Sequence, residues 1–419
     1  MKKPRVVIVG CGNRGLDAYG SWIADHPEEV DVVGLVDPQP NRIALGRRIF
    51  PQVKSSAVFE DWQDFLAHPA MADGVILATQ DQQHSEAAVA CAHRGYHLLL
   101  EKPMAPTEEE CREIIAEVLR SGIIFAVAHV LRYAPHFLEI HRLIREGAVG
   151  EVVTIQHAED VAYWHMAHSF VRGNWRNQVG SSFMLLSKSC HDIDLLRYFT
   201  GRPCRRVQSF GGLLHFRREM KPKEAGKALF CHECTFEPHC PYSSNKIYLR
   251  DRAAKGYRGW PLNVLRDDPT EESISEALRE GPYGRCVYEC DNDVVDHQVV
   301  NLEYAGGVTA SFTMSAFNEG GRRTVVQGTH GIIRAVEGQI RVLDFLHDSW
   351  KEVTVELPQG TADRHGGGDG GLLEAWVSDL RTGKRELIRS GAEESLETHL
   401  TTFAAERSRR HGGVETVVY

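Results

Sequence analysis

The sequence lacks a long apolar run, an excess of positive charge and any clear internal repeat. The opening segment MKKPRVVIVG reaches a glycine after only a short apolar run, far less than a signal-peptide core or a membrane span requires. Lysine and arginine total 48 against 57 aspartate and glutamate residues, so the net charge of -9 gives nucleic acid no electrostatic basis for binding. We therefore expect a cytoplasmic protein that binds neither nucleic acid nor membrane.

The chain is long enough to bury a large core. A length of 419 residues exceeds the usual size of one core, so we expect two domains. The hydrophobic fraction of 42% and the charged fraction of 25% are ordinary for a globular protein. In a reducing compartment most of the ten cysteines should be free thiols, and a local cluster of them favours a metal over disulfides.

The first third of the chain alternates strands and helices. A β-branched run at 5–9 ends in the glycine loop GCGNRG, and a helix can follow at 16–24. Thr107 and Glu110 form a capping box for a helix that ends at Gly122. This alternation predicts an α/β fold with a doubly wound parallel sheet. The remaining expected elements are strands at 32–36, 74–78, 97–100 and 125–128 and a helix at 84–95.

The glycine loop predicts a dinucleotide site. Gly10 permits the tight turn, Gly12 lets a pyrophosphate approach the backbone, and Gly15 lets the helix pack on the strand. Asp37 ends the next strand 22 positions after Gly15, near the spacing at which a carboxylate binds a ribose 2′-hydroxyl. Since Asp37 would repel a 2′-phosphate, NAD(H) is favoured over NADP(H). A solvated turn residue is the alternative interpretation.

A series of motifs, in their order along the chain, resembles the Gfo/Idh/MocA oxidoreductases, whose members act mostly on sugars, cyclitols and their derivatives. The resemblance rests on GCGNRG, Asp37, ATQDQQHSE, EKP at 101–103, HVLRYAPHF and SSFMLLSKSCHDIDLLRYF. It implies a Rossmann domain at 1–129 and a second α/β domain at 130–419, built on a large open, mainly antiparallel sheet. The cofactor contacts that it implies are Asn13, Arg14, Thr79, His84, Glu101 and Lys102.

Periodicity in the second half agrees with that sheet. Residues 299–304 and 308–314 flank a glycine turn and predict a hairpin, and further strands are expected at 323–327 and 332–336. Within the second domain lies a stretch rich in charge and turn residues at about 217–290, which we call the insert.

Oxidation of a secondary alcohol needs a base at the hydroxyl while the carbon faces the nicotinamide. Lys102 lies at the carboxyl end of a strand, where ligands bind in open α/β folds. The resemblance assigns it to the reacting hydroxyl. His191 is the second catalytic candidate, because HDID at 191–194 matches the family's His-Asp-x-Asp motif. In the same motif, Asp194 is expected to be a substrate-site or helix-start carboxylate.

One position departs from the family pattern. Many family dehydrogenases have an aspartate four residues before the histidine, whereas this chain has Ser187, followed by Lys188. Either His191 works with Lys102 alone, or Lys188 replaces the missing group. The Lys188 ammonium could instead bind an anionic substrate, or be a solvated lysine at a helix end.

The segment YWHMAHSFVRGNWRN at 163–177 predicts part of the substrate wall, since aromatic rings stack on sugar faces and arginines bind hydroxyls or carboxylates. Trp175, Arg172 and Arg176 are its candidate contacts, and a loop that merely buries its aromatic area is the alternative. The glycines of HGGGD at 365–369 suggest a backbone that approaches the ligand or the other domain.

These features predict reversible hydride transfer between NAD and a secondary hydroxyl of a sugar, sugar derivative or cyclitol. The alternative is an NAD-dependent glycoside hydrolase that oxidises a ring hydroxyl transiently, eliminates the glycosidic group, adds water and returns the hydride. A non-catalytic dinucleotide sensor is a third class, which Lys102 and His191 argue against. The family's open sheet implies a homo-oligomer, either a dimer or a tetramer.

The insert contains the most concentrated cysteines of the chain, in LFCHECTFEPHCPY at 229–242. Three thiolates from one segment need a fourth ligand, which Cys290, His232 or His239 could supply in place of Cys286. A tetrahedral structural zinc that closes the insert is the leading hypothesis, ahead of free thiols and a redox pair. Its expected ligands are Cys231, Cys234, Cys240 and Cys286.

Overall fold

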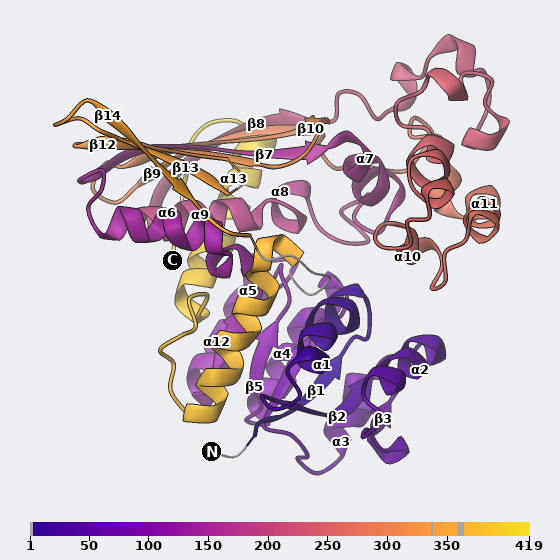
Figure 1. Ribbon diagram of the computed structural model, residues 1–419, viewed down its shortest axis with the longest axis horizontal. Helices are drawn as coiled ribbons and strands as arrows, with labels where there is room; N and C mark the ends of the chain where they lie inside the picture. The colour runs from indigo at the N-terminus through magenta and orange to yellow at the C-terminus, as the bar shows by residue number, and fades with distance from the viewer. Residues whose placement is uncertain (1–2, 337, 358–363) are drawn as a thin grey trace.

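The structure is a computed structural model that describes residues 3–336, 338–357 and 364–419. It has a lower domain that carries the N-terminus, an upper domain built on a broad sheet, and the insert at one edge of both (Figure 1).

The first domain is a six-stranded parallel sheet in the order β3-β2-β1-β4-β5-β6. The order reverses between β1 and β4, and ligands bind at the carboxyl ends of strands beside such a reversal. The prediction of a doubly wound parallel sheet is confirmed. Its strands are β1 (Arg5–Val9), β2 (Asp31–Val36), β3 (Val58–Phe59), β4 (Gly74–Leu77), β5 (His97–Leu100) and β6 (Phe125–Val127).

The helices of this domain follow the sequence signals closely. The Thr107 hydroxyl accepts the Glu110 amide at 3.3 Å and begins α5, which ends at Gly122 with φ +64°. The first helix begins at Asn13, earlier than expected, in a π-helical stretch η1 that continues into α1. The bounds are η1 (Asn13–Gly20), α1 (Ser21–Asp25), α2 (Pro40–Ile49), α3 (Trp62–Ala67), α4 (His84–His93) and α5 (Glu108–Ser121).

A helix from the far end of the chain completes the first domain. Helix α12 (Gly368–Thr382) lies along the N-terminal sheet (Figure 1), and Leu372 and Trp376 pack with Val6 and Ile8 in one core. The other face of the sheet is covered by α4 and α5, whose buried residues form a core with Val7 and Leu98. Residues 368–382 thus pack with the first domain although they lie between elements of the second in sequence.

The second domain is a nine-stranded sheet in the order β14-β13-β12-β11-β7-β10-β9-β8-β15. Strands β7 and β10 pair in parallel and the other neighbours pair antiparallel, which confirms the predicted mainly antiparallel sheet. The strands are β7 (Val152–Ala162), β8 (Cys204–Gly212), β9 (His297–Tyr304), β10 (Thr309–Asn318), β11 (Arg322–Gly328), β12 (Gly331–Val336), β13 (Gln339–Asp344), β14 (Ser349–Thr354) and β15 (Glu415–Thr416).

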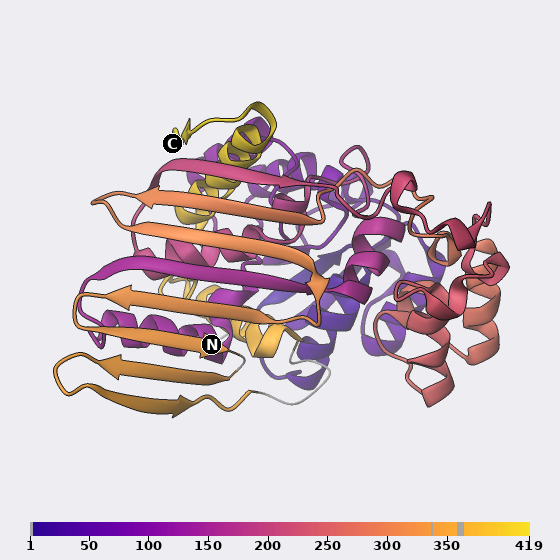
Figure 2. The same cartoon turned by 90° about the horizontal axis from the view of Figure 1, so that it is seen from above.

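Helices cover one face of this sheet and leave the other open, as Figure 2 shows from above. The covering helices lie between the two sheets, so they hold the domains together through a shared apolar core. They are α6 (Pro135–Arg145), α9 (Cys190–Thr200) and α13 (Ala392–His411).

The insert leaves the sheet after β8 and returns at β9, and it carries short helices that include α10 (Leu262–Leu265) and α11 (Glu271–Glu280). It contacts the first domain through polar bonds. Asp267 accepts from Asn41 Nδ2 at 2.8 Å and from Arg42 Nη1 at 3.4 Å. In the described parts of the chain no helix is both long and apolar enough to span a bilayer.

Candidate active site

The glycine loop borders a cavity of about 650 Å³ at the carboxyl ends of β1, β2 and β4. Of the residues predicted to bind the cofactor, Gly10, Gly12, Asp37 and Thr79 line this cavity. We call it the cofactor cavity. It lies beside the reversal of strand order, where the fold places its ligands.

The glycines have the steric roles that the sequence suggests. Gly10 has φ +93°, and a Cβ there would lie 2.5 Å from the Ala78 carbonyl oxygen. A Cβ on Gly15 would lie 1.9 Å from the Gly10 oxygen, because helix and strand touch at that point. Apart from Gly12 and its chain neighbours, no described residue has a heavy atom within 4 Å of a Cβ built on Gly12, so open space adjoins that backbone. This cradle fits the pyrophosphate of a dinucleotide.

Asp37 closes the cofactor cavity at the end of β2. Its Oδ2 accepts from the Cys11 amide at 2.8 Å and its Oδ1 from the Gln39 amide at 2.9 Å. These bonds fix the carboxylate at the wall of the cavity, where it can accept from a ribose hydroxyl. Arg42 lines the same cavity and donates to the Cys11 carbonyl at 2.7 Å.

A second cavity of about 600 Å³ lies between the domains and the insert, and we call it the substrate cavity. The glycine loop borders both cavities, since Gly10 and Gly12 line the cofactor cavity and Asn13 and Arg14 line this one. The predicted site residues that line it are Asn13, Arg14, Lys102, Trp175, Lys188 and His191, and its further lining residues are His165, Ser169, Phe170, Ser187, Tyr257, Gly259, Trp260, Arg322 and His365.

Lys102 follows β5 and points its ammonium across to the second domain. Its Nζ donates to the main-chain oxygen of Ser187 at 2.6 Å, and its amide donates to Glu101 Oε2 at 3.0 Å. Glu101 in turn accepts from Arg14 Nε at 2.5 Å and from the Tyr19 hydroxyl. Burial opposes ionisation of Glu101, but Arg14 holds the pKa of that carboxyl below its ordinary value.

His191 lies in the first turn of α9 with only 4% of its surface exposed. Burial, followed by the charge of Lys102, lowers the pKa of His191 well below its ordinary value, so the ring is neutral near pH 7. Among the described residues neither ring nitrogen has a hydrogen-bond partner, and Nδ1 is buried. A neutral imidazole with a free nitrogen can accept or donate a proton at a substrate hydroxyl.

Lys188 belongs to a network of alternating charges. Its Nζ lies 2.9 Å from Glu159 Oε1, and Arg322 Nη2 lies 2.7 Å from the other oxygen of Glu159. Arg322 Nε also donates to Asp192 at 2.7 Å. Burial opposes ionisation of Asp192, but Arg322 and then His157 hold the pKa of that carboxyl below its usual range. Lys188 is therefore fixed by a buried acid and is not a solvated residue.

Two predicted cofactor residues lie behind the cavities. His84 Nδ1 lies 2.8 Å from the Pro103 oxygen and Nε2 lies 3.2 Å from the Thr79 oxygen, so the ring ties the turn after β5 to that after β4. Glu101 supports Arg14 and Lys102 in a similar way.

Three predicted substrate contacts lie away from the substrate cavity. Asp194 is buried and pairs with Arg132 at 2.7 Å, linking α9 to the segment after β6. Arg176 pairs with Asp291 at 2.9 Å. Arg172 is only 1% exposed and donates to the Arg285 and Tyr242 carbonyl oxygens inside the insert's base.

Comparison with known proteins agrees with the two-domain arrangement. The description "Oxidoreductase family, NAD-binding Rossmann fold" matches residues 4–129, and "Oxidoreductase family, C-terminal alpha/beta domain" matches residues 141–417; both are parts of Gfo/Idh/MocA. The chain belongs to the Gfo/Idh/MocA oxidoreductase family. Its first domain is the NAD-binding domain of that family.

Individual relatives are distant. YteT of Bacillus subtilis (strain 168), named as an oxidoreductase, is 28% identical over 93% of this chain and 92% of its own length. Inositol 2-dehydrogenase 2 of Saccharopolyspora erythraea is 30% identical over 46% of this chain, which spans about half (53%) of that protein. The structure of scyllo-inositol dehydrogenase from Lactobacillus casei with NAD(H) and scyllo-inositol aligns with a TM-score of 0.68 and 17% identity over 99% of each chain.

The described residues of the structure do not show the predicted zinc site. Cys231, Cys234, Cys240 and Cys286 do line one small cavity of about 20 Å³. Yet within the described ranges no group of three or more His, Cys, Asp or Glu side chains is arranged to hold a metal ion. The Cys231 sulfur instead accepts from Arg172 at 3.6 Å and from the Ser244 amide at 3.4 Å. As they stand, the thiols do not fit a tetrahedral zinc site.

Sequence reasoning missed several residues of the substrate cavity. Arg322 begins β11, Trp260 and Tyr257 lie in the insert, and Glu159 supports Lys188 from β7. None belongs to a local motif, and each is far in sequence from Lys102. His365 lines the cavity as the glycines of HGGGD suggested, and the Asp369 carboxylate beside it accepts from Arg14 at 2.8 Å.

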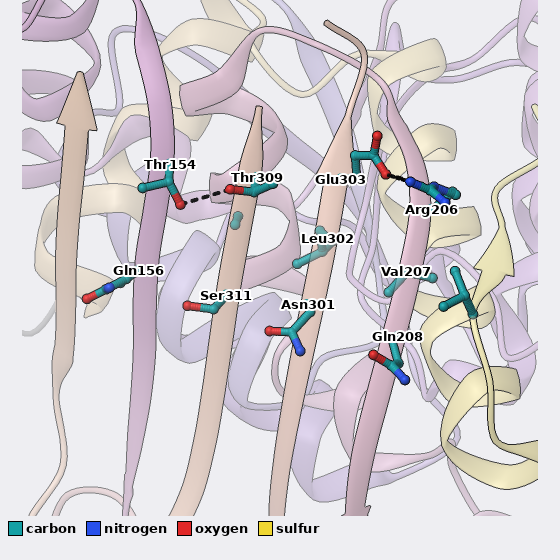
Figure 3. A pocket seen from close by; sticks show the side chains of 12 residues that line it. Thr154, Gln156, Arg206, Val207, Gln208, Asn301, Leu302, Glu303, Thr309 and Ser311 are labelled. Carbon is teal, nitrogen blue, oxygen red and sulfur yellow. Dashed lines mark hydrogen bonds and ion pairs between the residues drawn. The ribbon is translucent and has the colours of Figure 1, made fainter. Parts of the chain in front are cut away.

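A further hollow of about 390 Å³ lies on the open face of the large sheet (Figure 3). Side chains from β7, β8, β9 and β10 rise from this face, with an ion pair between Arg206 and Glu303 and a 3.0 Å bond between Thr309 and Thr154. It shares no lining residue with the two cavities at the glycine loop.

Proposed function

We propose that this protein catalyses reversible hydride transfer between NAD and a secondary hydroxyl of a sugar, sugar derivative or cyclitol. The observation that supports this most is that Lys102 and His191 line one cavity, which the glycine loop borders together with the cofactor cavity. NAD bound there would supply the hydride acceptor. The names of the inositol dehydrogenases among the relatives support the substrate class.

The chain's own residues would divide the work as follows. The Lys102 ammonium, directed by the Ser187 oxygen, would bind the reacting hydroxyl. His191, neutral near pH 7, would take the proton from that hydroxyl during oxidation and return it during reduction. The rings of Trp175 and Trp260 would pack against the apolar face of the substrate ring and hold its carbon toward the cofactor cavity.

The test is a screen of the purified protein with NAD⁺ against sugars, cyclitols and glycosides. Net NADH formation with at least one alcohol, lost in a Lys102→Met variant, is the expected result. Release of an aglycone with no net NADH would instead support the glycoside hydrolase described above. No turnover of any kind together with no binding of NADH, measured by fluorescence, would contradict both.

We also propose that two copies pair through the open face of the large sheet. The described residues leave this face uncovered (Figure 2), and it exposes the apolar side chains Phe210 and Val299, which are 58% and 37% exposed. Light scattering after size exclusion tests this: a dimer or tetramer is expected, and an Asn301→Arg variant should shift it toward monomer. A monomeric wild-type protein would contradict the proposal.

A cytoplasmic location likewise stays a prediction.

Zinc in the insert is a separate proposal, supported by the convergence of Cys231, Cys234, Cys240 and Cys286 on one cavity and opposed by their present arrangement. Elemental analysis of protein purified without chelator decides it. One zinc per chain, lost in Cys234→Ser, supports the site, and metal-free folded protein refutes it.

A further inference from the structure

The walls of the substrate cavity carry charges of one sign. Arg14, Lys102, Lys188 and Arg322 line it, and none of its lining residues in the described part of the chain is an aspartate or glutamate. A cavity for a neutral sugar needs no such excess, because sugar hydroxyls are bound well by mixed donors and acceptors.

The acids that balance these cations lie behind them. Glu159 is 4% exposed and Asp192 is fully buried, and they hold Lys188 and Arg322 from the protein side. Asp369, at 1% exposed, holds Arg14 in the same way. Each cation is therefore fixed in position while part of its donor set faces the cavity, which is how proteins prepare a site for an anion.

Some donor groups of these cations have no partner among the described residues, so they remain free to bind a ligand in the cavity. The Nη1 group of Arg322 makes no hydrogen bond to any described residue, although Nε and Nη2 are both bonded. The Lys188 ammonium has three donors and, in the part of the chain that the structure describes, one partner, Glu159. The two cations share Glu159, so they lie side by side and can bind two oxygens of one group.

We propose that the substrate carries an oxyanion, a carboxylate or a phosphate, that Lys188 and Arg322 bind together. This inference rests on the proposed function, since it assumes that the reacting hydroxyl lies at Lys102 and His191 in the same cavity. The substrate class is then an acidic sugar or sugar derivative. Charge-assisted bonds to two cations distinguish it from the neutral sugar of the same ring configuration.

The experiment compares matched substrates with the full chain and NAD⁺. The pairs are glucose with glucuronate, galactose with galacturonate, and each sugar with its 6-phosphate. We expect kcat/KM for at least one acidic member to exceed that of its neutral partner by about 10- to 100-fold, the size of charged hydrogen bonds. Comparison of the uronate pairs with the phosphate pairs shows whether the site prefers a carboxylate or a phosphate.

Two controls tie the preference to these side chains. Lys188→Met should reduce the acid-to-neutral ratio toward one, whereas Lys54→Met, at an exposed position of the first domain, should leave the ratio unchanged. Added salt should lower kcat/KM for the acidic member and not for the neutral one, and this measurement needs no variant.

The outcomes separate this inference from the proposed function. If neutral sugars are oxidised as well as or better than every acidic partner, the inference is overturned and hydride transfer stands. If no sugar is oxidised, calorimetric titration of the NADH complex tests the inference directly. The ligands are glucuronate, galacturonate and glucose 6-phosphate, and the affinity of each is compared with that of its neutral sugar. Tighter, salt-sensitive binding of an acid supports the inference, and equal or absent binding of the acids overturns it.

Discussion

The ammonium of Lys102 and the main-chain oxygen of Ser187 are joined by a hydrogen bond of 2.6 Å. The bond connects the end of β5 in the first domain to α8 (Met184–Ser187) in the second. Because a backbone carbonyl accepts it, the lysine is directed without a carboxylate at position 187. This chain lacks the aspartate that many family dehydrogenases have at this position, yet the position of the lysine is fixed.

Lys102→Met should abolish most of the turnover. Removal of a group that binds the reacting hydroxyl and helps its proton leave costs about 100- to 10,000-fold in kcat. The affinity for NADH, measured by fluorescence, should change little, since Lys102 lines the substrate cavity and not the cofactor cavity. A variant that keeps wild-type kcat would refute the role of Lys102.

Ser187→Ala is the matched comparison, and it should retain activity close to wild type. Among the described residues the serine hydroxyl bonds only to the Phe183 carbonyl at 3.3 Å, and the carbonyl that Lys102 uses is untouched. Steady-state kinetics of both variants on one substrate would check this. A loss as large as that of Lys102→Met would mean that the hydroxyl, and not the carbonyl, acts in the reaction.

Asp37→Ala should weaken NADH binding by about tenfold and reduce the preference for NADH over NADPH, because one charged acceptor for the ribose is lost. Arg42, which lines the same cavity, would then meet a 2′-phosphate without repulsion from the Asp37 carboxylate. Fluorescence titration with both cofactors measures the change. An unchanged ratio of the two dissociation constants would contradict the assignment of Asp37.

Asp267→Ala should speed the release of NADH by about two- to fivefold, the worth of an exposed ion pair and hydrogen bond. Asp267 holds the insert to Asn41 and Arg42, and Arg42 lines the cofactor cavity. Stopped-flow displacement of NADH measures the rate. Glu272→Ala, on the exposed side of α11, is the control, and equal rates in the two variants would exclude a role for this contact.

The stability of the protein should fall as pH drops below about 6.5, in part through His399. This ring is fully buried, Nδ1 donates to the Ser395 oxygen at 2.7 Å, and Nε2 accepts from the Met104 amide at 3.0 Å. Burial, followed by His129, lowers the pKa of His399 to about 3. The unfolded chain therefore binds a proton between pH 6.5 and 3 that the folded chain does not, and stability is lost as pH falls.

The comparison with His399→Gln isolates this effect, because glutamine can keep both bonds but does not titrate. Between pH 7 and pH 5 the wild type should lose about 2 kcal/mol more unfolding free energy than the variant. Urea unfolding at the two pH values gives the difference. Equal losses of unfolding free energy in both proteins would mean that His399 is protonated in the folded protein at pH 5.

Local signals in the sequence were sufficient for much of the fold and part of the site. The strand, glycine loop and Asp37 are contiguous or nearly so, and their backbone requirements are visible in residue types. For each of these, the physical cause acts within a few residues, so the order of residues is enough. Lys102 and His191 were assigned from the resemblance of their motifs to the family, and their catalytic roles stay a prediction.

Other contacts depend on segments that only folding brings together. Arg172 shares the segment of Trp175, yet one lies buried among cysteines of the insert and the other lines the substrate cavity. Helix α12 returns to the first sheet across most of the chain length. The apolar pattern of that helix predicts burial but does not name the surface that buries it.

The sequence by itself determined the parallel sheet and the dinucleotide loop, because local periodicity and turn chemistry specify them, and its resemblance to the family made Lys102 and His191 the candidate catalytic residues. Only the tertiary structure decided the charge of the substrate cavity. Lys188, Glu159 and Arg322 come from separate elements, and the side on which each acid lies relative to its cation is set by the packing of β7, β11 and α9.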